Sequence, residues 1–176
     1  MFDGWDNYYL MVGSSAGALI GLMFVVVTLT AGRGRAETER GKHLYTSPIV
    51  WHLGVILVLS GAAAVPGISA TAFSVIAGGL SLIGLAIGIR SAIGIYRYPG
   101  APEAPGFDTF WYGIAPALAY VGMAICALAI FRAWAWSTTA LAADLMALLL
   151  VSIHAEWDLV TYLAPIAGRS NDGNSI

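Results

Sequence analysis

The side chains that could do chemistry in this chain gather in its last apolar stretch. His154 and Asp158 stand four residues apart, and Asp144 stands three to four turns earlier. At about 100° per residue of helix, these three fall within roughly 80° of one another, and Tyr162 continues their stripe. Ionisable groups at membrane depth are costly unless they face a bundle interior or water. We therefore predict that this stripe faces inward or toward an oligomer axis.

We expect different surroundings for the residues on the other faces of the same helix. Leu145, Leu149 and Ile153 fall away from the stripe, so we expect them to face lipid. Glu156 also falls off the stripe, at about 160° from Asp158, and needs a neighbouring partner or the membrane interface.

Two residues of other apolar stretches are predicted to join the stripe. His52 lies near the start of the second stretch and Arg90 near the end of the third. If successive helices alternate in direction, both reach the level of His154 and Asp158. A carboxylate buried in lipid normally pairs with a cation. We predict one buried layer in which Asp158 is ionised and paired with Arg90 or with a histidine. The alternative is a polar network that only fixes helix packing.

Metal binding is a narrower hypothesis for the same residues. His154 and Asp158 can chelate one ion from adjacent turns, and His52 could supply a third ligand. Haem ligation by the two histidines would require that they face each other across an open cavity. Because polar pairs at this spacing are common on helices, the favoured expectation is no cofactor, with a metal ion as the alternative.

Long apolar stretches must position these side chains. The chain has 176 residues, of which 59% are hydrophobic and 10% charged, whereas soluble domains carry about 25% charged residues. About 20 helical residues cross the roughly 30 Å hydrocarbon core of a bilayer. The sequence thus predicts an all-α, polytopic transmembrane bundle of five spans in one domain, with four spans plus an interfacial helix as the second choice. The expected helices are 8–30, 48–65, 69–95, 109–132 and 138–163.

The basic residues predict the orientation. Five spans place seven of the eight Lys and Arg residues on one side, and Arg132 is the exception. Cytoplasmic loops carry such an excess. We expect a bacterial cytoplasmic (inner) membrane protein with its N-terminus outside and its C-terminus inside. The net charge of −2 offers no basic surface for nucleic acid.

Small residues predict where helices touch. Gly13, Gly17 and Gly21 recur every four residues in the first stretch, and Gly84 and Gly88 repeat the spacing in the third. Small residues let helix backbones approach closely in lipid. These glycines indicate packing either within one chain or between subunits of a homo-oligomer.

Four further residues carry local predictions. Pro66 and Gly67 indicate a tight turn between the second and third stretches. Pro116 is expected to bend the fourth helix because a proline removes a backbone hydrogen bond. The single cysteine, Cys126, is interpreted as a small packing residue.

Three segments carry a resemblance to known proteins. They are Gly13–Phe24, Thr46–His52 and Ile153–Tyr162, with Thr-Ser-Pro-x3-His in the second and Ile-His-x2-Trp-Asp-x-Val-Thr-Tyr in the third. In these segments the chain resembles a group of small bacterial multi-span integral membrane proteins. The resemblance implies a shared membrane fold and implies no reaction, substrate or cofactor.

Three functions remain open from the sequence. The first is an oligomeric channel or transport protein for a proton, an ion or a small solute. The second is an accessory or regulatory subunit of a larger membrane complex, and the third is a metal- or haem-binding membrane protein. The chain contains no Walker sequence, nucleophile elbow or Cys-x-x-Cys, so an enzyme is the less favoured interpretation.

Overall fold

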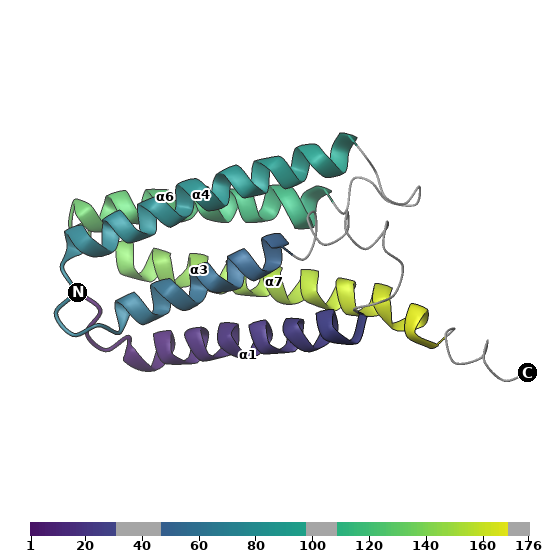
Figure 1. The fold of residues 1–176 in the computed structure, drawn as a ribbon. Coiled ribbons are helices and arrows are strands. Elements are labelled where there is room, and N and C mark those ends of the chain that lie inside the picture. Colours follow the sequence, from purple (N-terminus) through teal and green to yellow (C-terminus); the bar gives the residue numbers. More distant parts are fainter. Residues whose placement is uncertain (31–46, 98–108, 169–176) are drawn as a thin grey trace, which may run out of the picture.

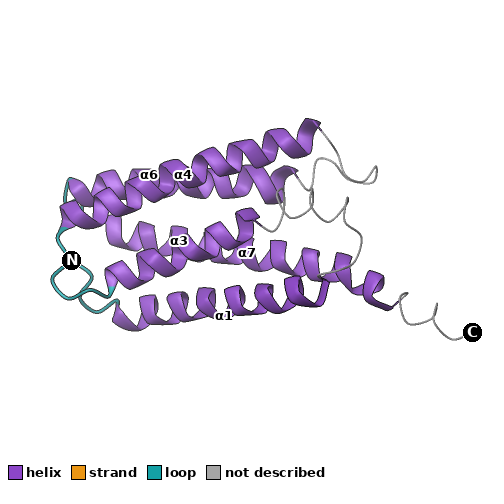
Figure 2. Cartoon of the chain, in the orientation of Figure 1, coloured by secondary structure: helices purple, strands orange, loops and turns teal. Residues whose placement is uncertain are grey.

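The computed structural model describes residues 1–30, 47–97 and 109–168 (Figure 1). Within these ranges the elements are helical, as Figure 2 shows, which confirms the predicted all-α class. In chain order they are α1 (Asp6–Thr30), α3 (Ser47–Ala63), α4 (Ala70–Arg97), the π-helical turn η2 (Phe110–Ile114), α6 (Ala115–Phe131) and α7 (Ser137–Gly168). The last helix runs five residues beyond its predicted end at 163.

The helices lie side by side in a bundle (Figure 1). α3 packs against α1, α4 and α7, and α6 packs against both α4 and α7. Contact between α1 and α7 closes the ring. Because α3 and α7 also touch, packed side chains cross the middle of the ring.

Four helical segments are long and apolar enough to cross a membrane: Asp6–Thr28, Ala70–Gly94, Phe110–Phe131 and Ser137–Thr161. Their outer faces expose large apolar side chains. Phe24 is 72% exposed, Val75 69% and Leu82 67%. An apolar outer surface of this extent is unfavourable in water and is what a lipid environment would cover.

α3 is the shorter apolar helix, and it is the most deeply packed. Its 17 residues rise about 26 Å. Leu53, Ile56 and Leu59 are fully buried. The helix runs alongside its neighbours in Figure 1.

The predicted turn at Pro66 and Gly67 is confirmed. The Ile68 N–H donates to the Val65 carbonyl at 3.2 Å, and Gly67 has φ of +70°. A positive φ at the third turn residue, after a proline, is the arrangement of a type II turn and favours glycine. Ser69 then caps α4, because its Oγ accepts from the Ala72 N–H at 3.1 Å.

The connection between α6 and α7 is a compact helix end without glycine. The Trp134 N–H donates to the Ala129 carbonyl and the Ala133 N–H to the Ile130 carbonyl, both at 3.0 Å. These two bonds make a Schellman motif, whose left-handed position is usually glycine. Here Ala133 holds that position with φ of 54°.

The expected irregularity at Pro116 takes the form of the π-helical turn η2 just before it. The Ala115 N–H donates to the Phe110 carbonyl, five residues back. Pro116 has no N–H to donate to Tyr112, and its ring crowds that carbonyl, so the preceding turn widens.

The glycines of α4 pack closely against α6, as predicted. A Cβ at Gly84 would overlap the ring of Tyr120, and a Cβ at Gly88 would lie 3.3 Å from the Cβ of Ala117. The sequence analysis missed Gly113, where a Cβ would lie 2.6 Å from that of Ala92. Small residues on both helices therefore let α4 approach η2 and α6.

The glycines of α1 behave differently from one another. A Cβ at Gly13 would lie 3.0 Å from the Cβ of Ser60 on α3, so this position is a helix contact. Gly17 and Gly21 have no described atom within 4 Å of such a Cβ. Packing within this chain accounts for Gly13 and does not account for the other two.

Gly84→Ala should lower the free energy of unfolding by about 1–3 kcal/mol, the usual cost of overpacking. The Tyr120 ring is fully buried and hydrogen-bonded to His52, so it cannot move aside cheaply. The control is Gly17→Ala, where a methyl group meets open space and the better helix former should be neutral or stabilising. Thermal unfolding in detergent, followed by circular dichroism, measures both, and equal melting temperatures for the two variants would contradict the packing of α4 on α6.

Candidate functional site

The predicted orientation of α7 is wrong. Leu145 is fully buried and Leu149 is 5% exposed, although both were expected to face lipid. Ile153, at 40% exposed, faces outward as expected. A helical wheel separates polar from apolar faces, but bundle interior and lipid are both apolar, so it cannot tell which apolar face packs inward. Both leucines belong to the buried core of the bundle.

His154 and Asp158 form a pair on the flank of α7. Their Nε2 and Oδ2 atoms are 3.4 Å apart, and the two side chains are 34% and 38% exposed. The ring of Trp111 in η2 covers His154, with centroids 4.3 Å apart. The pairing of Asp158 with a histidine is thus the arrangement found, and it lies beside the bundle core.

Arg90 does not join this pair. Its position on α4 is exposed, and among the described residues no ion pair links it to Asp158. The physical reason is the helix order, because α4 packs on α3, η2 and α6 while Asp158 lies on the outer flank of α7.

His52 has a partner that the sequence analysis did not name. The His52 side chain is 3% exposed, and its Nδ1 lies 2.7 Å from the hydroxyl oxygen of Tyr120. A buried tyrosine hydroxyl needs a hydrogen-bond partner, so Tyr120 in an apolar stretch was a usable signal. His52 is therefore engaged with α6 and not with His154.

The predicted metal set is not assembled. Because His52 is bonded to Tyr120 while His154 and Asp158 pair on the flank, the three ligands are separated. Across residues 1–30, 47–97 and 109–168 there is no group of three His, Cys, Asp or Glu side chains that could hold a metal ion. The predicted fourth member of the stripe, Tyr162, has its side chain outside the described part of the structure.

Asp144 lies in a space that a glycine leaves on α6. A Cβ at Gly122 would lie 2.6 Å from the Asp144 Oδ1 atom. The Oδ2 atom is buried and has no hydrogen-bond partner among the residues described. Gly122 was not recognised from sequence, since nothing local marks it as the neighbour of a carboxylate.

Glu156 places a carboxyl group on the buried side of α7. Its side chain is 3% exposed, and neither carboxyl oxygen has a hydrogen-bond partner within the described ranges. It lies at about 20° from Leu145 on the helical wheel, near the middle of the packed face of α7. The expected neighbouring partner is thus absent from the part of the chain that the structure covers.

The elements around Glu156 hold it in place through its neighbours. The Tyr112 hydroxyl of η2 donates to the carbonyl oxygen of Ala155 at 3.2 Å. One turn earlier, the Ser152 hydroxyl is fully buried and donates to the Leu148 carbonyl at 2.8 Å. The first bond joins η2 to α7 next to Glu156, and neither bond involves its carboxyl group.

The structure therefore distributes the polar residues over several places instead of one layer. His52 with Tyr120 joins α3 to α6, Asp144 faces Gly122, and Glu156 lies in the core. An unpaired carboxyl group inside a bundle of apolar helices can bind a proton or a cation, and intramembrane ionisable groups usually mark such pathways.

Comparison with known proteins finds no matching family model, no matching curated protein and no matching solved structure. The resemblance to small bacterial membrane proteins therefore stays a prediction.

Tyr120→Phe should destabilise the protein by about 1–3 kcal/mol, because it leaves the buried His52 ring nitrogen without its partner. The control is Tyr8→Phe. The Tyr8 hydroxyl donates to the Ala142 carbonyl. In the variant this carbonyl still accepts its backbone hydrogen bond within α7, so we expect a smaller loss of stability. Chemical denaturation in detergent gives both values; an equal or greater loss for Tyr8→Phe would show that the His52 bond is not the stronger constraint.

Glu156→Met should raise the free energy of unfolding by about 1–3 kcal/mol, the cost of burying a polar group without a hydrogen bond. Methionine has a similar length and suits an apolar core. Asp6→Asn is the control, since Asp6 is exposed and such changes usually stay within about 0.5 kcal/mol. A lower melting temperature for Glu156→Met would mean that the carboxyl group has a stabilising partner.

Proposed function

We propose that this chain is a five-span integral membrane protein that acts, as a homo-oligomer, as a channel or transport protein for a proton, an ion or a small solute. Four apolar helices of spanning length and a buried fifth helix beside them support the membrane location. The apolar outer faces support it as well.

The proposed location is a bacterial cytoplasmic membrane, with the N-terminus outside and the C-terminus inside. The end of α7 lies at the opposite end of the bundle from the N-terminus (Figure 1), which suits an odd number of passes. α1 and α4 also end on the side of the bundle opposite the N-terminus. The connection that follows α1, residues 31–46, contains four of the eight basic residues and lies outside the described residues, and α4 itself ends at a fifth, Arg97.

The observation that carries the proposal is the buried carboxyl group of Glu156. An apolar residue at this core position would make the folded protein more stable. Retaining an unpaired ionisable group inside a membrane bundle is costly, so it is expected where a charge or a proton passes.

Two features support the proposed homo-oligomer. α3 packs against α7 across the middle of the ring, so a route through one protomer must pass between packed side chains. Gly17 and Gly21 leave an open strip on α1, where the helix of a second copy can approach closely.

The same open strip favours a second function. A helix of another membrane protein would fit it equally well, which suits an accessory or regulatory subunit of a larger membrane complex. Affinity isolation in mild detergent separates the two functions: a stable heteromeric partner supports the accessory role, and a pure homo-oligomer supports the first proposal.

Reconstitution into liposomes tests transport directly. Vesicles with and without the protein are loaded with dyes that report protons, monovalent cations, anions or volume change caused by a neutral solute. At least one species should cross protein-containing vesicles faster than protein-free ones. No flux of any species at several pH values would overturn the proposal.

A further inference from the structure

We infer that the species bound inside this bundle is the proton and that the carboxyl group of Glu156 is the group that holds it. This inference rests on the proposed transport function and names its substrate. It is carried by one observation: among the described residues, the carboxyl group of Glu156 is 3% exposed and has no hydrogen-bond partner, on the face of α7 that also carries the buried Leu145 and Leu149.

The surroundings of Glu156 suit a proton better than a metal cation. Calcium takes six to eight oxygen ligands and magnesium requires near-octahedral coordination. Throughout the described ranges there is no group of three His, Cys, Asp or Glu side chains that could bind an ion together. The hydroxyl of Ser152, one turn earlier on the same face, already donates to the Leu148 carbonyl, and that of Tyr112 donates to the Ala155 carbonyl. A proton needs a single oxygen atom, which Glu156 supplies.

No described titratable group near α7 is hydrogen-bonded to Glu156. On the same helix, Asp144 lies against Gly122 of α6, with its Oδ1 atom in the space that a Cβ would occupy. On α7 itself, His154 and Asp158 pair with each other on the flank, at about 160° from Glu156 on the helical wheel. Within the structure's described residues, no hydrogen bond or ion pair joins Glu156 to any titratable group of the elements that pack against α7. These groups are His52 on α3, Tyr112 on η2, Tyr120 and Cys126 on α6, and Asp6, Tyr8 and Tyr9 on α1.

The transfer step is a reversible protonation. A carboxylate oxygen of Glu156 forms an O–H bond with a proton that a hydronium ion on one side of the membrane gives up, leaving water. On release, the O–H bond breaks and the proton passes to a water molecule connected to the other side. The carboxyl group returns to its ionised form, so each cycle moves one positive charge and consumes nothing.

Proton flux in proteoliposomes containing Glu156→Gln tests this assignment. The isosteric amide keeps the shape of the side chain and cannot carry the proton. Vesicles with an internal pH dye and a potassium diffusion potential should lose flux on the order of a hundredfold, the scale of removing a positioned proton-transfer group. Glu156→Asp should retain measurable flux, and the exposed Asp6→Asn should match the parent. Infrared difference spectra between acidic and alkaline pH should show a carboxylic acid band that Glu156→Gln lacks.

The outcomes separate the inference from the proposed function. Parent-like proton flux in Glu156→Gln, or transport of sodium, potassium or an anion without proton flux, would overturn the proton assignment and leave transport in place. No flux of any species in the parent protein would overturn the transport function and the inference with it. If Glu156→Gln does not fold, as judged by gel filtration, the infrared difference spectrum of Glu156→Asp decides: carboxylic acid bands identical to those of the parent protein would overturn the assignment.

Discussion

The Tyr120 side chain joins three helices of this bundle at one point. Its ring, carried by α6, lies over Gly84 of α4, where no Cβ could be placed without overlap. Its hydroxyl oxygen lies 2.7 Å from the Nδ1 atom of His52 on α3. A fully buried aromatic ring with both its face and its polar atom engaged fixes the distance and the rotation of its neighbours. This bond ties the short helix α3 to α6.

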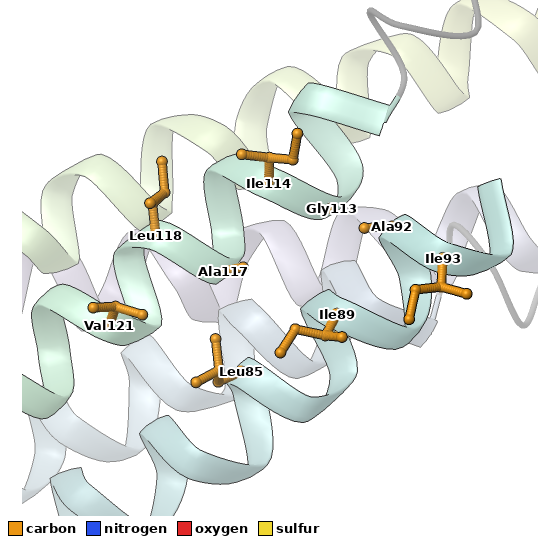
Figure 3. A pocket seen from close by; sticks show the side chains of 9 residues that line it. All are labelled: Leu85, Ile89, Ala92, Ile93, Gly113, Ile114, Ala117, Leu118 and Val121. Carbon is orange, nitrogen blue, oxygen red and sulfur yellow. The ribbon is translucent and has the colours of Figure 1, made fainter. Parts of the chain in front are cut away.

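The small-residue contact between α4 and α6 has a second consequence, which Figure 3 shows. Because Gly88 and Gly113 bring the two helices together, their larger side chains diverge toward the outside. They enclose an open apolar groove of about 240 Å³. It is lined by Leu85, Ile89, Ala92, Ile93, Gly113, Ile114, Ala117, Leu118 and Val121. No polar side chain lines it, which is the condition expected for a surface in contact with lipid chains.

The buried face of α7 combines apolar side chains with a carboxyl group. Leu145, Leu149 and Ser152 are buried on one face, and Glu156 continues this face without a hydrogen-bond partner among the described residues. The pair of His154 and Asp158, which is the more conspicuous pattern in the sequence, lies on the flank beside Trp111. The spacing of polar residues along α7 therefore did not indicate which carboxyl group is buried.

Local patterns in the sequence were enough to predict the helical class, the long apolar helices and several local features. These follow from short-range physics: hydropathy over about 20 residues, the positive φ that Gly67 accepts, and the missing N–H of Pro116. It also indicated that Gly84 and Gly88 mark helix contacts, since small residues do so generally in lipid.

Which faces of the helices pack together depends on the folded bundle as a whole. Interior and lipid are equally apolar, so the pattern of α7 could not show that Leu145 and Leu149 pack inward. Nor could it show that Arg90 and Asp158 lie apart, because that depends on the order of helices around the ring. Tyr120 with His52, and Gly122 with Asp144, are contacts between residues distant in sequence, which no local pattern encodes. Glu156 became a candidate site for the same reason: its burial is a property of the assembled bundle.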